Sequence, residues 1–200
     1  MSTFLTPTSL QGRHVLLEPL TADHAEPLRK AATDGELWKL WFTSVPAPEG
    51  VAEYVRDKLS KQAQGTMQSF VVRLLSTGDV VGHTAFANVD ANNRRVEIGY
   101  TWYAACVQRT AVNTETKFLL LQHAFESLHC IAVEFRTHWL NQRSRAAIAR
   151  LGAKQDGVLR NHQRLPDGSF RDTVVFSIIE SEWLAVKQHL SFKLEQGEQA

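Results

Sequence analysis

The sequence predicts a mixed α/β domain whose sheet is mostly antiparallel. Short segments rich in β-branched and aromatic residues alternate with polar turns in the middle third of the chain, which is the pattern of a strand meander. Segments with apolar residues at spacings of three and four lie on both sides of that meander and predict helices. A strand, a loop, a helix and a further strand across residues 94–138 predict a right-handed parallel crossover within the sheet.

The first third of the chain is expected to be mainly helical. An opening strand over 13–20 precedes a helix over 21–33, which Pro27 is expected to kink or to restart. An aromatic cluster ended by prolines follows, and a second helix is expected over 51–65 because its apolar residues recur every four positions.

The rest of the chain supplies most of the sheet. The expected elements are three meander strands over 69–75, 79–87 and 94–103, a helix after Asn113, a strand over 131–138, a helix from Asn141 to about Gly152, a strand pair over 158–163 and 171–179, and a last helix over 180–194. The order is therefore β-α-α-β-β-β-α-β-α-β-β-α. A ligand is expected where the helix of the crossover begins.

Length and composition describe one folded domain. The chain has 200 residues, 44% of them hydrophobic and 22% charged, without an internal repeat or a low-complexity stretch. We expect a single domain over 1–200, with an ordered core over 10–194 and a loose polar tail over 195–200. A chain of this length can build its core without a disulfide or a structural metal.

Charge and cysteine content argue against several kinds of partner. The 22 Lys and Arg balance 21 Asp and Glu, so the net charge of +1 lacks the basic field that nucleic-acid binding needs. Cys106 and Cys130 belong to no metal-ligand spacing, so no metal is expected and a reducing cytoplasm is the default. No segment has the composition of a targeting sequence or a membrane span, so a membrane is not an expected partner.

The crossover loop is the segment that points most directly to function. Glu97–Tyr103 forms the strand before it, and Gln108–Glu115 opens the helix after it. Small and polar residues at a helix start direct unpaired backbone N–H groups and the positive end of the helix dipole toward an anion. This pattern favours a diphosphate site, and the alternative is an ordinary connection.

Together with the apolar strand that follows and the helix start at Asn141, this succession resembles the GNAT superfamily of acyl-CoA-dependent N-acyltransferases. The resemblance extends from about residue 10 to residue 190 and is strongest to the branch that contains the ribosomal-protein alanine N-acetyltransferases. It implies a seven-stranded mixed sheet, flanked by helices and splayed open between the strand that ends at Tyr103 and the strand over 131–138. Acetyl-CoA would be the co-substrate, with its pantetheine arm in the splay.

The resemblance also assigns residues to the binding of acetyl-CoA. The pantetheine arm would pair with the backbone around Trp102 and Tyr103, and Asn141 would bond its amide region. The diphosphate would rest on the crossover loop, at Gln108, Arg109, Thr110, Ala111, Val112, Asn113 and Thr114.

The loop departs from the usual pattern of the family, which is Gln/Arg-x-x-Gly-x-Gly/Ala. Gln108 matches, but Ala111 and Asn113 stand at the two glycine positions. Placing Ala111 in a left-handed conformation would cost about 1–2 kcal/mol, so the loop tolerates it if its φ is negative or the fold absorbs the strain. Asn113 can instead serve as the N-cap of the helix.

Acetyl transfer to an amine needs a base, a donor for the oxyanion and a proton source for the thiolate. Glu97 is the candidate base, because strand alternation would place it on one face with Gly99 and Thr101. The alternative for Glu97 is a cross-strand ion pair with an arginine, namely Arg73, Arg95 or Arg136. Two strand histidines, His83 and His138, are rival bases.

By resemblance, the oxyanion donor is the backbone N–H of Trp102 or Tyr103, and the proton source is Ser144. Ser144 stands one turn into the helix that Asn141 begins, where the family places a residue facing the sulfur. Simple capping of that helix is the alternative for both Asn141 and Ser144.

The acceptor pocket is expected beneath the aromatic cluster before the second helix. Trp38, Trp41 and Phe42 fall where the first two helices of the family cover the acceptor, and core packing is their alternative role. At pH 7 a lysine-type amine costs about 4.6 kcal/mol to deprotonate and an α-amine only about 1–1.4 kcal/mol. A carboxylate base therefore favours an α-amine as the acceptor.

The resemblance, together with these observations, predicts a cytoplasmic N-acetyltransferase that moves an acetyl group from acetyl-CoA to a primary amine by direct attack in a ternary complex. An acyl-enzyme is less favoured because neither cysteine has an activating histidine in the motif, and Cys106 is the one to test. The alternatives are a catalytically silent acyl-CoA-binding or sensing module and a protein-interaction domain. A homodimer is left open.

Overall fold

The computed structural model describes residues 4–197, and these residues form one eight-stranded sheet. Its order is β1-β2-β3-β4-β5-β6-β8-β7, and the neighbouring strands are antiparallel except for β5 and β6. The strands are β1 (Leu10–Gln11), β2 (Val15–Pro19), β3 (Gln68–Leu74), β4 (Val80–Asp90), β5 (Arg95–Tyr103), β6 (Ala132–His138), β7 (Lys154–Arg164) and β8 (Phe170–Ile179).

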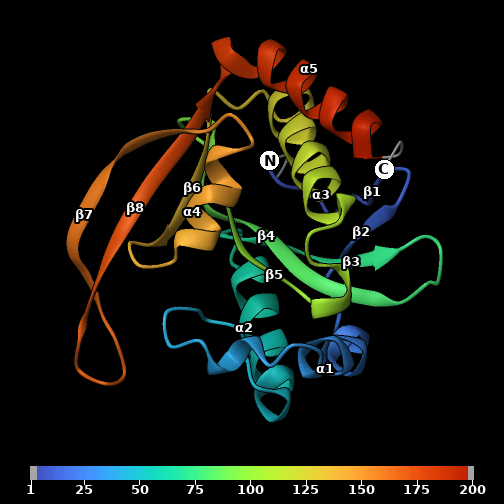
Figure 1. Ribbon diagram of the computed structural model, residues 1–200, viewed down its shortest axis with the longest axis vertical. Helices are drawn as coiled ribbons and strands as arrows, with labels where there is room; N and C mark the ends of the chain where they lie inside the picture. Colours follow the sequence, from blue (N-terminus) through green and yellow to red (C-terminus); the bar gives the residue numbers. More distant parts are fainter. Residues whose placement is uncertain (1–3, 198–200) are drawn as a thin grey trace.

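Helices cover both faces of this sheet. In Figure 1, α1 and α2 lie together on one side and α3 and α5 lie together on the other, with the central strands between the two pairs. Their bounds are α1 (Ala25–Thr33), α2 (Val51–Ala63), α3 (Ala111–Gln122), α4 (Gln142–Ala149) and α5 (Glu180–Gly197). The short helix α4 packs beside β6 and β8.

The predicted fold class is confirmed: the sheet is mixed, mostly antiparallel and flanked by helices. The strand number is eight rather than seven, because residues 10–11 add a two-residue strand that pairs with β2. Pro27 does not kink a continuous helix. A short 3-10 turn over Ala22–His24 comes first and α1 starts at Ala25, so Pro27 lies in a first turn, where its missing N–H leaves no acceptor unpaired.

Two further boundaries differ from the prediction. Thr110, not Asn113, is the N-cap of α3, because the Val112 N–H donates to Thr110 Oγ1 at 3.3 Å and the helix begins at Ala111. At the other end, α5 continues through Gly197 although a loose tail was expected from residue 195. The rest of that expected tail, 198–200, lies outside the described residues.

β5 and β6 pair only near their first residues. Three register pairs join them, and the last is Glu97 with Glu134. β5 then continues to Tyr103 and β6 to His138 without any further pairing between these two described strands. The gap between the diverging strands is called the splay below. The splay confirms what the resemblance implied about this sheet.

A β-bulge in β5 decides which side chains face which side of the splay. The register with β4 takes up one extra residue of β5 at Tyr100, whose φ is 52°. An extra residue inverts the alternation of the side chains that follow it. Thr101 therefore faces α3, where Lys117 contacts it, whereas Glu97 and Gly99 lie on the opposite face. The expectation that Glu97 and Thr101 share a face is wrong for this reason.

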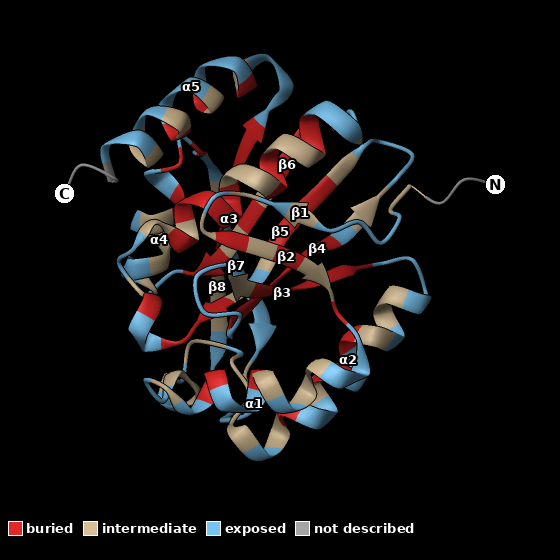
Figure 2. Cartoon of the chain, turned by 90° about the vertical axis from the view of Figure 1, so that its right-hand side faces the viewer, coloured by how far each residue is buried: buried red, intermediate tan, exposed pale blue. Residues whose placement is uncertain are grey.

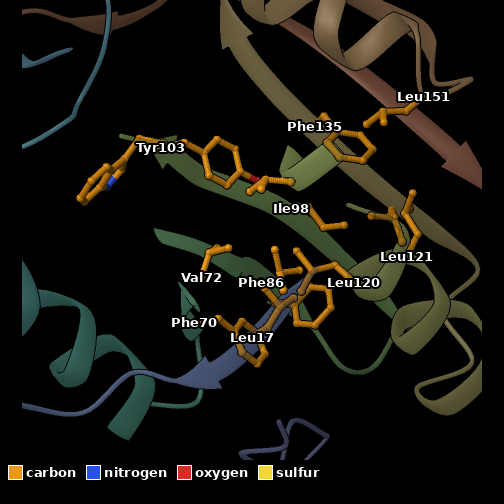
Figure 3. Packing of buried hydrophobic residues seen from close by; sticks show 14 of the residues in the cluster. Leu17, Phe70, Val72, Phe86, Ile98, Tyr103, Leu120, Leu121, Phe135 and Leu151 are labelled. Atoms are coloured by element: carbon orange, nitrogen blue, oxygen red, sulfur yellow. The ribbon is translucent and has the colours of Figure 1, made fainter. Parts of the chain in front are cut away.

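Most of the hydrophobic core lies along the central strands and the inner side of α3. Phe70 of β3 and Phe86 of β4 are almost fully buried, and their rings meet edge to face with centroids 5.9 Å apart. Leu17 and Leu120 pack beside them (Figure 3). Figure 2 shows buried residues concentrated in the middle of the sheet, whereas β7 at its edge is largely exposed. The splay is thus bordered by a well-packed scaffold.

Glu115 anchors α3 to the start of β2. Its buried carboxylate accepts hydrogen bonds from the backbone N–H groups of Arg13, His14 and Val15, at 2.7, 2.8 and 2.9 Å. The carboxylate also fills the space above Gly12, where a Cβ would lie 2.5 Å from Glu115 Cδ. A side chain larger than hydrogen at position 12 would therefore push Glu115 away.

We expect Glu115→Ala to lower the free energy of unfolding by about 2–4 kcal/mol, because it leaves three backbone donors without their charged acceptor. Urea unfolding measures this loss. Glu53→Ala, on the exposed side of α2, is the control and should change stability by less than about 0.5 kcal/mol. Equal stability of the two variants would show that the Glu115 contacts contribute nothing.

Candidate active site

A cavity of about 690 Å³ occupies the splay. Ile98 to Tyr103 of β5 and Phe135 to His138 of β6 line it, together with the start of α3, the inner side of α4 and the segment between α1 and α2. Ile98, Tyr103 and Phe135 border it from the two strands (Figure 3). The cavity therefore reaches both faces of the sheet through the gap between the strands.

The start of α3 leaves backbone N–H groups available at this cavity. The amides of Val107 and Gln108 donate to carbonyls of the preceding turn, and the Val112 amide donates to Thr110 Oγ1. Among residues 4–197, no acceptor outside the helix is bonded to the amides of Ala111 or Asn113, and a first helical turn has no acceptor of its own. The loop can thus offer N–H groups and the helix dipole to an anion.

The backbone of this loop shows whether Ala111, at a position where the family has glycine, is strained. Arg109 has the left-handed conformation, with φ 63°, whereas Ala111 has helical geometry with negative φ. Ala111 therefore carries no strain. Asn113 stands in the first turn and lines the cavity, so its predicted role as the N-cap is wrong and Thr110 has that role.

The free edge of β5 presents Tyr103 to the splay. The Ala104 N–H donates to Val81 of β4, and the direction of backbone groups alternates along a strand. Trp102 therefore directs its N–H toward β4, whereas Tyr103 directs its own toward the splay. The Tyr103 carbonyl, on the same edge, accepts a hydrogen bond from Gln108 Nε2 at 3.2 Å. Of the two predicted oxyanion donors, the geometry favours Tyr103.

Glu97 lies at the closed end of the splay and is 8% exposed. Its Oε2 accepts a hydrogen bond from Asn88 at 2.6 Å and lies 3.6 Å from Arg136 Nε, so the ion pair considered as its alternative role is formed. Its Oε1 sits over Gly99, which lines the cavity, although Glu97 itself is not among the lining residues. Burial raises the pKa of this carboxyl above its ordinary value, and the Asn88 hydrogen bond and Arg136 oppose the shift.

The rival base His83 has a structural position. Its Nδ1 lies 3.0 Å from the Tyr100 carbonyl oxygen and 3.0 Å from the Tyr54 hydroxyl. Because a carbonyl oxygen only accepts, Nδ1 carries a proton and donates it to Tyr100, which holds the bulge. The ring is fully buried outside the cavity lining, and burial lowers its pKa to about 4.

The rival base His138 lines the cavity and is 4% exposed. Its Nδ1 accepts the Leu140 N–H at 3.0 Å, so the proton of the neutral ring is on Nε2. Nε2 has no partner within residues 4–197. Trp41 and Phe42 contact the ring, with centroids 5.0 and 6.4 Å away. His138 thus carries a buried N–H donor that no described group accepts, on a residue that lines the cavity beside Phe42.

Asn141 and Ser144 both line the cavity at the start of α4. Asn141 Oδ1 accepts the Ser144 N–H at 3.1 Å, so Asn141 caps the helix, as its alternative role stated. Capping uses the side-chain oxygen of Asn141 and the backbone of Ser144. The amide group of the first and the hydroxyl of the second remain beside the cavity.

The structure brings together only part of the predicted set. The cavity lining includes Phe42, Trp102, Tyr103, Gln108, Arg109, Thr110, Asn113, Asn141 and Ser144. It does not include Trp38, Trp41, Glu97, Ala111, Val112 or Thr114. Val112 and Thr114 are buried in the packing of α3, and Trp41 lies outside on Phe42 and His138 with 55% of its surface exposed.

Lys117 is a cavity residue that the sequence reasoning missed. It is 6% exposed on α3, and its Nζ donates to Thr101 Oγ1 at 2.5 Å. Burial lowers its pKa to about 7, and the charge of Glu97 opposes that shift. The signal was present: Lys117 stands four residues after Asn113, hence on the same helix face, in a helix that is otherwise apolar in its later turns.

Arg171 of β8 is one of several arginines in the cavity lining. Its Nε donates to Thr173 Oγ1 at 3.0 Å. Cys106, by contrast, is poorly suited to form an acyl-enzyme. The neighbouring Asp34 raises the pKa of its thiol, so little thiolate forms near neutral pH.

Comparison with known proteins agrees with this geometry. The family described as the acetyltransferase (GNAT) domain matches residues 14–154. The putative ribosomal N-acetyltransferase YdaF of Bacillus subtilis (strain 168) is 32% identical over 110 residues, which are 55% of this chain and 59% of that protein. The match thus spans less than two thirds of YdaF.

Solved structures share the fold over nearly the whole chain. A GCN5-related N-acetyltransferase from Brucella melitensis is 32% identical with a TM-score of 0.85, over 95% of this chain and 86% of that one. RimJ of Mycobacterium smegmatis, solved in complex with CoA-disulfide, is 20% identical with a TM-score of 0.79, over 94% of this chain and 95% of that one. At that identity, the likeness to RimJ shows the fold alone.

The splayed sheet, its cavity and these matches define an acyl-CoA-dependent transferase. The chain belongs to the GNAT acetyltransferase domain family. Within residues 4–197, no helix is both long and apolar enough to cross a bilayer. Over the same range, no group of three or more His, Cys, Asp or Glu side chains is placed to hold a metal ion.

The burial of Lys117 makes a prediction about stability. Below pH 7 the folded and the unfolded chain both protonate this amine, and folding then buries a charge. Between pH 7 and about 10.5 only the unfolded chain binds the proton, so the stability of the wild type rises with pH relative to a variant without the amine. We expect Lys117→Met to be more stable than the wild type at pH 7, by a margin that shrinks toward pH 10.

Urea unfolding at pH 7, 8 and 9 measures this margin. Lys154→Met is the control, because the Lys154 side chain is 76% exposed, and its stability should follow that of the wild type at each pH. A margin between Lys117→Met and the wild type that stays constant with pH would contradict the burial of the amine.

Proposed function

We propose that the protein transfers an acetyl group from acetyl-CoA to a primary amine by direct attack within a ternary complex. The observation that carries this proposal is the open helix start of α3 at a cavity that passes through the splay. One ligand can enter between α3 and α4 while another enters beneath the segment between α1 and α2. The two ligands can then meet between the strands without a covalent enzyme intermediate.

The residues at the start of α3 fit a diphosphate. The amides of Ala111 and Asn113 and the dipole of the helix face the anion, and the helical backbone of Ala111 removes the strain that its side chain would otherwise cause. Bound acetyl-CoA supplies an acetyl group activated as a thioester. Asn141, which lines the cavity from α4, is the side chain we assign to its pantetheine arm.

Glu97 is the base that we assign to the acceptor. Burial raises the pKa of Glu97 and so brings it closer to the pKa of the amine whose proton it must accept. Glu97 does not itself line the cavity, but its Oε1 lies over Gly99, which does. The proton of the acceptor therefore reaches the carboxylate past Gly99. A weak base of this kind suits an α-amine better than a lysine side chain.

Two further polar groups are assigned to the charges that develop on the oxygen and on the sulfur during transfer. The Tyr103 N–H, directed into the splay, is the oxyanion donor that the geometry supports. Ser144 is the hydroxyl that faces the sulfur from α4. Asp34 disfavours a thiolate at Cys106, which supports direct attack over an acyl-enzyme.

The acceptor that we propose is the α-amine of a peptide or protein. Phe42 and His138 line the acceptor side, and the Nε2–H of His138 is placed to bind a carbonyl oxygen next to such an amine. The similarity to YdaF, whose name describes a putative ribosomal N-acetyltransferase, supports a protein acceptor. Both cysteines are free thiols, which supports a cytoplasmic location.

Binding of acetyl-CoA is the first test. We expect it to raise the melting temperature of the wild type, and we expect Asn113→Glu to lose at least about 10-fold in affinity because a carboxylate would face the diphosphate. A glutamate at this helix position favours the helix itself, so the variant should fold. Asn113→Gln is the matched control and should bind like the wild type. The proposal fails if acetyl-CoA at millimolar concentration has no effect on the wild type.

The pH profile of transfer tests Glu97. The carboxylate form is active, so the rate should rise with pH through a pKa above the ordinary value of 4.5, and Glu97→Gln should remove that limb. We expect Glu97→Gln to lose about 10²–10⁴ in kcat while the affinity for acetyl-CoA changes less than about 2-fold.

Glu134→Gln is the control for this test. Glu134 also contacts Arg136, but it stands on β6, opposite Glu97 at the last paired position of the two strands. The Glu134→Gln variant should keep the rise of the transfer rate with pH. Turnover of α-amino peptides, measured as release of free thiol, is the assay. An acyl-CoA-binding module without activity would bind acetyl-CoA and release no thiol with any amine of the panel.

A further inference from the structure

Lys117 reaches the splay from the face opposite to Glu97. Its Nζ donates to Thr101 Oγ1 and lies 5.9 Å from the centroid of the Phe135 ring on β6. Thr101 is itself bonded to the hydroxyl of Thr84 at 2.8 Å, which holds the acceptor of the lysine in place. The amine is therefore fixed between the two diverging strands at the α3 side of the cavity.

The amine lacks the partners that a buried ammonium needs. An ammonium group has three N–H donors, and within residues 4–197 the only hydrogen-bond partner of Lys117 is the neutral hydroxyl of Thr101. None of the described carboxylates lies within 4 Å of its Nζ. A buried charge is stabilised when a partner of opposite charge is present. The cavity that Lys117 lines is where that partner would stand.

The position of Lys117 along α3 indicates which part of a ligand it meets. Asn113, in the first turn, lines the cavity at the proposed diphosphate site, and Lys117 lines it about 6 Å further along the helix. Glu97 is the charged group that raises the pKa of Lys117, and it marks the closed end of the splay. A ligand that extends from the helix start toward Glu97 thus presents its far end, the thioester, to Lys117.

We propose that Lys117 is the proton donor to the sulfur that leaves during acetyl transfer. This inference rests on the proposed function. The nitrogen of the acceptor forms a bond to the acetyl carbon, the carbon–sulfur bond breaks, and its electron pair stays on sulfur. A proton on Nζ passes to that sulfur, giving a thiol and a neutral lysine, while the proton lost by the acceptor goes to Glu97. Return of one proton from Glu97 to Lys117 restores the starting state.

The electrostatics of the two groups suit this exchange. Burial moves the pKa of Glu97 up and that of Lys117 down to about 7, so burial narrows the free-energy difference between the charged pair and the neutral pair that forms during transfer. Ser144 can donate a hydrogen bond to sulfur, but a hydroxyl carries no positive charge. Thr101 of β5, Thr84 of β4 and Phe135 of β6 surround the Lys117 amine, and none of them is ionisable. Glu97 acts on the amine through its charge from the other face of the sheet. The other ionisable residues of the same cavity lining are Tyr103, Arg109, Arg136, His138, Arg143, Arg150 and Arg171, with Tyr54 and Tyr100.

Titration of the thiol of bound CoA tests this inference without an acceptor. Thiolate absorbs in the ultraviolet, so its formation can be followed in the protein–CoA complex as pH rises. A lysine beside the sulfur should lower the thiol pKa by about one pH unit or more relative to free CoA, and Lys117→Met should abolish the shift. Lys117→Arg keeps a positive charge and should retain much of the shift, which separates charge from general misfolding.

Desulfo-CoA, which lacks the sulfur, is the matched ligand. At pH 8 we expect Lys117→Met to weaken CoA binding by about 3-fold or more, and to change desulfo-CoA binding less than about 2-fold. Lys154→Met should bind both ligands like the wild type. Calorimetry measures all four combinations. The inference is overturned if the thiol of bound CoA titrates alike in the wild type and Lys117→Met, or if both ligands lose affinity equally.

The pH profile of turnover gives a second readout. Lys117 as a proton donor should give a limb that falls as pH rises through about 7, and Lys117→Arg should lose turnover although it retains the charge. An acetyl group found by mass spectrometry on Lys117 itself would overturn the inference, because the amine would then be a nucleophile. A wild type that binds neither CoA nor acetyl-CoA overturns the proposed function and this inference together. Binding with an unshifted thiol overturns this inference alone.

Discussion

The function of this fold depends on the end of backbone pairing between β5 and β6 after three residue pairs. Each strand keeps its other neighbour, since β6 pairs with β8 along its whole length and β5 pairs with β4 on both sides of the bulge. The free edges therefore cannot close without breaking those ladders. Backbone groups left unpaired in a buried place cost free energy unless a ligand or water bonds to them. A ligand with amide groups of its own, such as the pantetheine arm of CoA, can take the place of the missing strand contacts.

The same divergence explains why charged side chains gather at one point of an apolar core. Glu97 and Lys117 approach the closed end of the splay from opposite faces, and Glu97 is paired with Arg136 while Lys117 meets only a hydroxyl. Burial shifts both pKa values toward the neutral form. Such groups lower stability, and proteins tolerate local costs of this kind mainly where they serve chemistry. Glu115, by contrast, has a structural role, since its carboxylate is bonded to the backbone at the start of β2.

The sequence predicted what depends on local pattern. Apolar periodicity and turn residues placed most strands and helices within a few residues, since each is encoded in its own segment.

The splay was predicted only from the resemblance, because no local pattern shows where two distant strands stop pairing. The bulge at Tyr100 was missed because a non-glycine residue with positive φ has no clear sequence signal, and it inverted the expected face of Thr101. Lys117 was missed because a lysine in a helix is usually solvated. Trp38 and Trp41 were placed in the pocket because they fall where the first two helices of the family cover the acceptor, and of the predicted Trp38, Trp41 and Phe42 only Phe42 lines it.

Backbone amide chemical shifts of the nitrogen-labelled protein, recorded with and without CoA, test most directly whether the splayed strand and the start of α3 hold the ligand. We expect the largest changes at the amides of Ala111, Asn113 and Tyr103. Among the described residues the first two have no acceptor outside their helix, and the Tyr103 N–H is directed into the splay. Changes confined to the edge hairpin of β7 and β8, with these three amides unmoved at saturation, would contradict the role assigned to the splay.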